Sequence, residues 1–233
     1  MKQINALLFL FLLLSISCSS QESDQNLQEQ NQLKSYLALG DSYTIGESVA
    51  ISDRFPMILV NDLNEQGYNF QEPKIVAKTG WTTDELKAAI VNEGLAKNYD
   101  LVTLLIGVNN QYRGRDVENF RIEFADLLNI AIGFANGKPE NVIVVSIPDW
   151  GVSPFGSSRD QKKIAKEIDL YNKVKKEETL KINVTFVDIT EVSRSGLGNP
   201  EYFAKDGLHF SGKMHQLWVD EIISQYFDKN MSK

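Results

Sequence analysis

The stretch LALGDSYTIG, residues 37–46, joins an apolar run to a short polar turn. An apolar run of this length, ending at Gly40, is typical of a buried strand. Asp41 and Ser42 follow at once, and a second glycine, Gly46, ends the turn. The stretch therefore places Ser42 at the carboxyl end of a strand, which is where open α/β sheets bind their ligands.

Four more apolar runs follow, and helical patterns separate them. The five expected strands are residues 36–40, 74–78, 100–107, 141–148 and 183–190. The expected helices are residues 52–66, 82–96, 117–135, 159–179 and 211–228. Ser52 is a candidate cap for the first helix, and Thr82 with Glu85 has the spacing of a capping box. Alternating strands and helices predict an α/β fold, a three-layer α/β/α sandwich around a parallel sheet with right-handed crossovers.

The beginning of the chain has the layout of a secretory signal. Met1 and Lys2 give a positive start, the apolar run of residues 6–16 follows, and small serines come next. This run is short for a membrane span, so residues 1–17 are interpreted as a signal peptide.

Cys18 is the only cysteine and comes directly after that signal. It stands where bacterial lipoproteins carry their lipidated cysteine, although Ser15 occupies a position that is usually Leu in such signals. Residues 18–34 are too polar to fold alone and are expected to be the lipidation site and a flexible linker. The prediction is a bacterial lipoprotein anchored in the periplasm or at the cell surface. A secreted or periplasmic protein with an ordinary signal peptide is the alternative.

Residues 35–233 have the size of one globular domain. The chain has 24 Lys and Arg against 31 Asp and Glu, a formal charge of −7. That balance argues against nucleic-acid partners and against attraction to anionic lipid heads. Membrane contact is expected through the lipid anchor only, and the sequence predicts no oligomeric state.

Polar or glycine-bearing segments follow each expected strand, and they should converge on one edge of the sheet. The segments are GDS at 40–42, KTGW at 78–81, GVNN at 107–110, PDW at 148–150 and DGLH at 206–209.

Ser42 could act as a nucleophile if a base lay within hydrogen-bond reach, because a serine hydroxyl is weakly nucleophilic at neutral pH. The chain has two histidines, and His209 lies three residues after Asp206. Asp206 can turn back to the imidazole Nδ1–H and leave Nε2 facing outward. Ser42, Asp206 and His209 therefore form a candidate catalytic triad.

Three groups are candidates to stabilise the negative oxygen of an ester-cleaving transition state. They are the backbone N–H groups of Ser42 and Gly80 and the side-chain amide of Asn109. Taken singly, each of these residues could equally be part of an ordinary turn or cap.

In this order, GDSY, TGW, GVNN and DGLH resemble the four motif blocks of the SGNH or GDSL hydrolases, a family that includes lipases and acylhydrolases. The resemblance extends over residues 36–228. It implies a flavodoxin-like sandwich with a five-stranded parallel sheet and hydrolysis of esters without a metal or cofactor. It also implies that the residues naming the family are Ser42, Gly80, Asn109 and His209, with Asp206 completing the triad.

Two positions depart from the family pattern. Asn110 stands where Asp is frequent, and Phe210 where Pro often follows the histidine. Asn110 is expected to affect the geometry of its loop more than the chemistry.

The substrate is predicted to be a small-molecule ester, a glycan ester or a lipid. Trp81, Tyr112 and Trp150 are candidate substrate-binding residues, although they could also pack the loops. Short acyl groups, such as acetyl on a glycan, are slightly favoured over a lysophospholipase or thioesterase substrate, because no loop has an apolar run long enough for a lid.

Three further interpretations concern residues near these motifs. The spacing of His215 from His209 is unusual for zinc, so a metal site with His209 and Asp206 is not expected. His215 is expected to be an ordinary, partly exposed side chain on the last helix. Arg113 and Arg115 could contact an anionic substrate or simply be solvated. A non-catalytic flavodoxin-like binding module, holding phosphate in the loop after the first strand, is the alternative from another functional class. It leaves Asp206 and His209 without a role.

Overall fold

The computed structural model describes residues 33–228, so the predicted signal peptide, Cys18 and nearly all of the predicted linker lie outside the described residues. One parallel sheet is formed by β1 (Tyr36–Gly40), β2 (Lys74–Ala77), β3 (Leu101–Leu105), β4 (Val142–Val145) and β5 (Thr185–Val187). Its strand order, β2-β1-β3-β4-β5, is the flavodoxin-like order of doubly wound folds. The predicted three-layer α/β sandwich with a five-stranded parallel sheet is confirmed.

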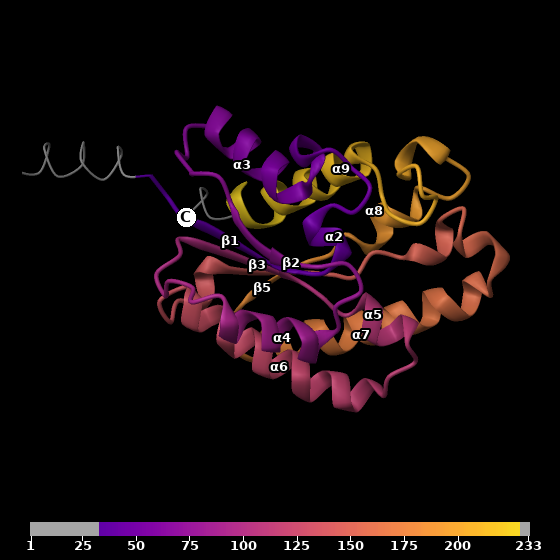
Figure 1. The fold of residues 1–233 in the computed structure, drawn as a ribbon, viewed down its shortest axis with the longest axis horizontal. Helices are drawn as coiled ribbons and strands as arrows, with labels where there is room; N and C mark the ends of the chain where they lie inside the picture. Colours follow the sequence, from indigo (N-terminus) through magenta and orange to yellow (C-terminus); the bar gives the residue numbers. More distant parts are fainter. Residues whose placement is uncertain (1–32, 229–233) are drawn as a thin grey trace, which may run out of the picture.

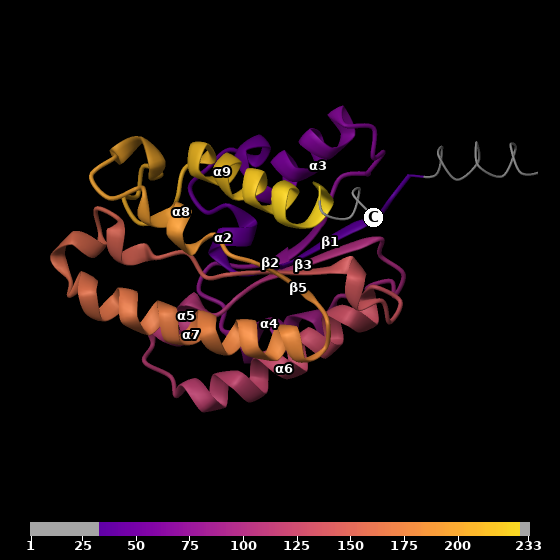
Figure 2. The same cartoon turned by 180° about the vertical axis from the view of Figure 1, so that it is seen from behind.

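The longer helices cover both faces of this sheet (Figures 1 and 2). One face carries α3 (Phe55–Glu65) and α9 (Gly212–Ile222), and the other carries α4 (Thr83–Asn92), α6 (Val117–Phe134) and α7 (Gln161–Lys181). Three short helices, α2 (Ser42–Ile45), α5 (Val108–Tyr112) and α8 (Thr190–Arg194), follow β1, β3 and β5 at the carboxyl ends of the strands.

Burial explains why these segments adopt their structure. All residues of β1, β3 and β4 are buried, as expected for central strands covered on both faces. Helix α6 buries one stripe at helical spacing, made of Phe120, Phe124, Leu127, Leu128 and Ala131. Within residues 33–228, no helix is both long and apolar enough to cross a bilayer.

The ends of several helices differ from the prediction. Helix α3 begins at Phe55 and not at Ser52, because Ile51–Asp53 forms a 3₁₀ turn and Arg54 is extended. Pro56 then lies in the first turn of α3, where its missing N–H costs no hydrogen bond. Helix α9 is followed by a π-helical turn, Ile223–Phe227. The capping box of α4 is confirmed, since the Thr82 N–H donates to Glu85 Oε2 at 2.9 Å.

Candidate active site

Ser42 is the first residue of α2, directly beyond the end of β1. Asp41 caps this helix by accepting a hydrogen bond from the Tyr43 N–H on Oδ1 at 3.1 Å. Gly40 permits the tight turn, because a Cβ there would lie 2.1 Å from Thr44 Oγ1 and 2.4 Å from the Leu105 carbonyl oxygen. Ser42 is 5% exposed. The turn therefore holds the Ser42 hydroxyl at the edge of the core. The Ser42 N–H is also among the first N–H groups of α2, which have no partner within the helix.

Asp206 and His209, the predicted acid and base, are hydrogen-bonded to each other. His209 Nδ1 lies 2.6 Å from Asp206 Oδ2, while the backbone N–H groups of Leu208 and His209 donate to Oδ1. Ser48 adds a hydrogen bond from its hydroxyl to Oδ2 at 2.8 Å. Burial raises the pKa of Asp206, but the hydrogen bonds from His209, Leu208 and Ser48 outweigh it and lower the pKa to about 2. An ionised Asp206 holds the Nδ1–H tautomer of His209 and leaves Nε2 available to accept a proton.

The loops that carry Ser42 and His209 lie against each other. The ring of Tyr43, next to Ser42 in the chain, meets the His209 ring edge-on at a centroid distance of 5.9 Å. Ser48 belongs to the same segment, five residues beyond Tyr43, and its hydroxyl donates a hydrogen bond to Asp206. Two contacts thus join the segment after β1 to the segment before α9, although more than 150 residues separate Ser48 from Asp206 along the chain.

Gly80 and Asn109 come together in the second and third loops. Gly80 has a φ of +88°, and residues 78–81 form a turn closed by a hydrogen bond from Trp81 N to the Lys78 carbonyl. Asn109 Nδ2 donates to the Trp81 carbonyl at 3.0 Å. An amide nitrogen carries two N–H groups, so this bond leaves the second for another acceptor. Among the described residues, none accepts a hydrogen bond from the Gly80 N–H.

Arg113 bonds the same turn and does not extend freely into solvent. Its Nη2 donates to the Gly80 carbonyl at 2.6 Å, and its Nη1 lies 3.4 Å from Glu85. Arg115 pairs with Asp84 at 2.6 Å. Both guanidinium groups therefore hold α5 to the beginning of α4.

The two departures from the family pattern have structural roles. Asn110 is fully buried and exchanges hydrogen bonds with the backbone and hydroxyl of Thr83, which ties α5 to α4. Phe210 is fully buried against the rings of Tyr43, Phe203 and Trp218. It therefore anchors the histidine loop through packing.

The three aromatic residues predicted to bind substrate differ in exposure. Tyr112 is 52% exposed, whereas Trp150 is 5% exposed and meets the Tyr112 ring at a centroid distance of 5.4 Å. Trp150 is held by its indole N–H, which donates to Gln111 Oε1 at 2.8 Å. Trp81 is half-buried against the core. Tyr112 is therefore the one of the three that offers a large free surface.

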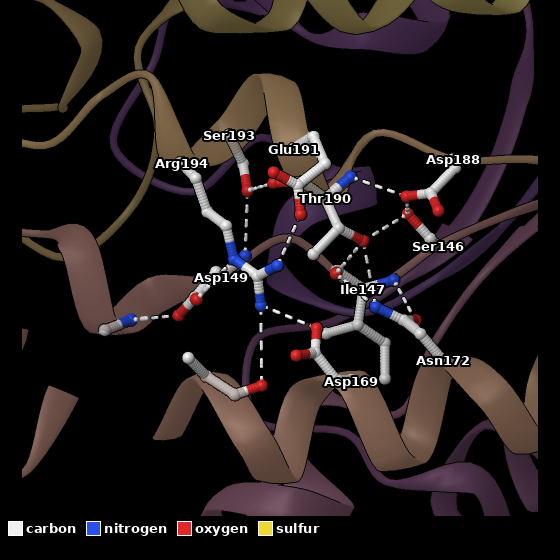
Figure 3. Close-up of polar contacts among 12 residues, drawn as sticks. Ser146, Ile147, Asp149, Asp169, Asn172, Asp188, Thr190, Glu191, Ser193 and Arg194 are labelled. Carbon is white, nitrogen blue, oxygen red and sulfur yellow. Dashed lines mark hydrogen bonds and ion pairs between the residues drawn. The ribbon is translucent and has the colours of Figure 1, made fainter. Parts of the chain in front are cut away.

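An ion pair between a partly buried arginine and a buried aspartate fixes the loop after β4 (Figure 3). Arg194, at the end of α8, donates from Nε to Asp149 Oδ2 at 3.0 Å and also pairs with Asp169 and Glu191. Burial disfavours the charge of Arg194, but its hydrogen bonds to Asp169, Asp149 and Glu191 outweigh burial and raise the guanidinium pKa above its usual value. Asp149 also accepts the Gly151 N–H at 2.9 Å. Trp150 lies between Asp149 and Gly151 in the chain, so these bonds fix the backbone position of Trp150.

His215 corrects one expectation from the sequence. It lies on α9 as predicted, but it is 1% exposed and its Nδ1 lies 2.8 Å from the Asp53 carbonyl. Burial lowers the pKa of His215 to about 4, so it is neutral at physiological pH. Over residues 33–228, no group of three His, Cys, Asp or Glu side chains is placed to hold a metal ion.

Three contributors to the site were not found from the sequence. Ser48 bonds Asp206, Gln111 holds Trp150, and Arg194 pairs with Asp149. Ser48 carries no motif, and only its positive φ of 64° marks it as unusual for a residue other than glycine. Each acts through a contact between distant segments, which local patterns do not reveal.

Comparisons with known proteins show the family and the fold of the chain. Residues 38–217 match the model of the GDSL-like Lipase/Acylhydrolase family, and no curated protein matches the sequence. The lipase/acylhydrolase from Enterococcus faecalis is similar in structure, with 22% identity and a TM-score of 0.65 over 84% of this chain and 97% of that chain. Axe2, an acetylxylan esterase from Geobacillus stearothermophilus, is 18% identical and has a TM-score of 0.65, over 83% of this chain and 94% of that chain. The esterase EstA from Pseudoalteromonas sp. is 14% identical and has a TM-score of 0.60, over 86% of this chain and 100% of that chain. The chain belongs to the GDSL-like Lipase/Acylhydrolase family and is a hydrolase of ester bonds.

Proposed function

We propose that this protein is a serine esterase that cleaves carboxylic esters through an acyl-enzyme on Ser42. His209 takes the Ser42 proton as Oγ attacks the ester carbonyl, and a tetrahedral oxyanion forms. His209 then gives this proton to the leaving alcohol, and the acyl group stays on Oγ. Water, deprotonated by the same imidazole, attacks the acyl-serine and releases the acid.

The observation that carries the proposal is the Asp206–His209 pair beside the Ser42 loop. The 2.6 Å contact at Nδ1 fixes the imidazole so that a proton arriving at Nε2 is stabilised by a carboxylate. The Tyr43–His209 ring contact supports the short approach between the nucleophile loop and the base.

The oxyanion is proposed to bind the N–H groups of Ser42 and Gly80 and the amide of Asn109. One N–H of the Asn109 amide donates to the Trp81 carbonyl, and this bond fixes the direction of the second N–H. Donors that are fixed before the reaction stabilise developing charge without reorganisation, and this effect supplies much of the rate acceleration in many such enzymes.

Short acyl groups, such as acetyl on a glycan, are the proposed substrates. The exposed ring of Tyr112, backed by buried Trp150, offers a flat surface on which a sugar can stack. The structural likeness to an acetylxylan esterase points the same way. Lysophospholipids and thioesters are the alternative within the family.

Rates on p-nitrophenyl esters from acetate to palmitate test both the reaction and the acyl preference. Ser42→Ala serves as the blank. The proposal predicts the highest kcat/KM on acetate or butyrate and no turnover above the blank for the variant. A maximum at decanoate or longer would contradict the short-acyl preference and favour the lipid alternative.

A flavodoxin-like binding module was the sequence-based alternative from another functional class, and the family match argues against it. It would bind a phosphate or flavin at the loop after β1 and would give no Ser42-dependent ester cleavage. Colourless purified protein with such cleavage excludes it.

We also propose that the protein is exported by residues 1–17 and anchored through Cys18. The linker would join the domain at the amino end of β1, whereas Ser42 lies beyond the carboxyl end of this strand. A five-residue strand spans roughly 17 Å, so an anchor would hold the candidate site away from the membrane. Metabolic labelling with an alkyne fatty acid should mark the wild type and leave Cys18→Ser unlabelled. Equal labelling of both would reject Cys18.

A further inference from the structure

Lys175 of α7 is a charged residue buried completely in the core. Its Nζ donates to the carbonyl of Ile106 at 3.0 Å and to the carbonyl of Val145 at 2.8 Å. Val145 is the last residue of β4, and Ile106 directly follows β3. One ammonium group therefore joins the carboxyl ends of the two central strands.

Asp41 lies near enough to this ammonium group for its charge to favour the ammonium form. Gly40 and Leu105 are partners in the parallel register, so the next residues, Asp41 and Ile106, leave the sheet side by side. Asp41 is fully buried; its Oδ1 accepts the Tyr43 N–H, and the backbone of Gly107, which follows Ile106, also favours the charged carboxylate. Burial raises the pKa of Asp41 to about 7 and lowers that of Lys175 to about 7, while each charge opposes the shift of the other.

Other groups around Lys175 come from neighbouring elements. The Phe124 ring of α6 lies 5.6 Å from Nζ, and Asp188, which follows β5, also favours the charged ammonium. Asp188 is exposed and bonds the Ser146 hydroxyl and the Thr190 N–H. Asp41 is thus the fully buried carboxylate near Lys175.

The positions bound to or beside Lys175 each precede a candidate active-site residue. Asp41 precedes Ser42, Ile106 lies three residues before Asn109, and Val145 lies five residues before Trp150. We propose that Lys175 is a positioning residue of the active site. From the core, it fixes the positions of the loops that carry Ser42, Asn109 and Trp150 relative to one another. The inference rests on the proposed function, because it assigns these loops their catalytic meaning.

The cost of burial favours positioning over simple stabilisation. Replacing two buried opposite charges together by apolar side chains of similar volume is often neutral or stabilising, so such charges contribute little to overall stability. Their directed hydrogen bonds can instead fix one arrangement of the loops. A positioning role predicts loss of kcat in a folded protein, whereas a structural role predicts a lower Tm with unchanged kcat.

The test compares Lys175→Met, Asp41→Asn and the double variant, with Lys173→Met as control. Asn at position 41 can still accept the Tyr43 N–H, and Lys173 is an exposed lysine of the same helix with its side chain 71% exposed. Kinetics on p-nitrophenyl acetate give kcat and KM, and hydrogen–deuterium exchange follows residues 40–46 and 106–112.

Lys175→Met is expected to lower kcat about tenfold or more while KM changes less than about threefold. Amide exchange should quicken in both segments. The double variant should be no slower than the slower single variant, because residues that act as a unit are not additive. Lys173→Met should match the wild type throughout.

Wild-type kcat and exchange in folded Lys175→Met would overturn the inference. If this variant fails to fold, Asp41→Asn decides: the inference predicts faster exchange in residues 106–112, and a change confined to residues 40–46 would refute it. A wild type without esterase activity would instead reject the proposed function, and the exchange experiments would still decide whether Lys175 holds the loops.

Discussion

Asp206 makes four polar contacts at the candidate site. Its carboxylate faces His209 Nδ1, two backbone N–H groups and the Ser48 hydroxyl. These bonds keep the carboxylate ionised and oriented before a substrate arrives. Preorganisation of this kind makes the imidazole a base of fixed direction.

Ser48→Ala should lower kcat roughly threefold to tenfold, because one hydrogen bond contributes about 1 kcal/mol. The loss should fall on kcat more than on KM, since Ser48 bonds Asp206 and acts through it. Ser52→Ala is the control, because this serine lies in the same loop and bonds its neighbour Asp53. Equal rates for wild type and Ser48→Ala would show that the Ser48 bond does not matter for catalysis.

Asn109→Ala removes a proposed donor to the oxyanion. It should lower kcat by about 10²–10³, or roughly 3–4 kcal/mol, as the loss of a single such donor does in other hydrolases. KM should change little, because the bond forms in the transition state. Steady-state kinetics on p-nitrophenyl acetate measure both constants, and full activity in the variant would remove Asn109 from the oxyanion site.

At the scale of elements, two glycines should respond to alanine with opposite signs. Gly40→Ala places a Cβ 2.4 Å from the Leu105 carbonyl, whose strand pairs with β1, so it should lower the free energy of unfolding by about 2–3 kcal/mol. Gly133, inside α6, has no atom within 4 Å of a built Cβ, and Gly133→Ala should raise the free energy of unfolding by about 0.5–1 kcal/mol. Urea unfolding measures both, and a neutral Gly40→Ala would contradict the packing of this turn.

Helix α8 is joined to the loop after β4 by the Arg194–Asp149 pair. Arg194→Met should lower the free energy of unfolding by about 3 kcal/mol, because it leaves the Asp149 charge buried without its partner. Adding Asp149→Asn should recover part of this loss. Lys87→Met breaks an exposed pair with Asp126 and should cost less than about 0.5 kcal/mol. If the Arg194 and Lys87 variants unfold at the same urea concentration, the Arg194–Asp149 pair does not fix this loop.

For the whole molecule, the alternation of apolar runs and helical patterns was enough to predict the layers and the parallel sheet. Strands β1, β3 and β4 are buried on both faces, so their sequences are nearly all apolar, with Thr103 in β3 as a polar exception. The predicted ranges 100–107 and 141–148 extend beyond the observed ends of β3 and β4. Short helices such as α5 were missed, because five residues give no helical period. The beginning of α3 was also misplaced, since Ser52 is a good capping residue that here lies in a 3₁₀ turn.

The candidate site was predictable to the extent that its groups lie in short motifs. Asp206 and His209 are three residues apart, so their contact is local and readable. The supporting contacts of Ser48, Gln111 and Lys175 join segments at least 30 residues apart, and only the folded chain brings them together. The burial of Trp150 and His215 depends on the same long-range packing.

The central claim is that Ser42 is a nucleophile activated by His209. Labelling with a serine-reactive phosphonate ester, followed by intact-mass and peptide mass spectrometry, tests it most directly. The account predicts one adduct per chain, mapped to Ser42, and labelling slowed by several orders of magnitude in His209→Ala. An adduct on another residue, or equal labelling of wild type and His209→Ala, would contradict it.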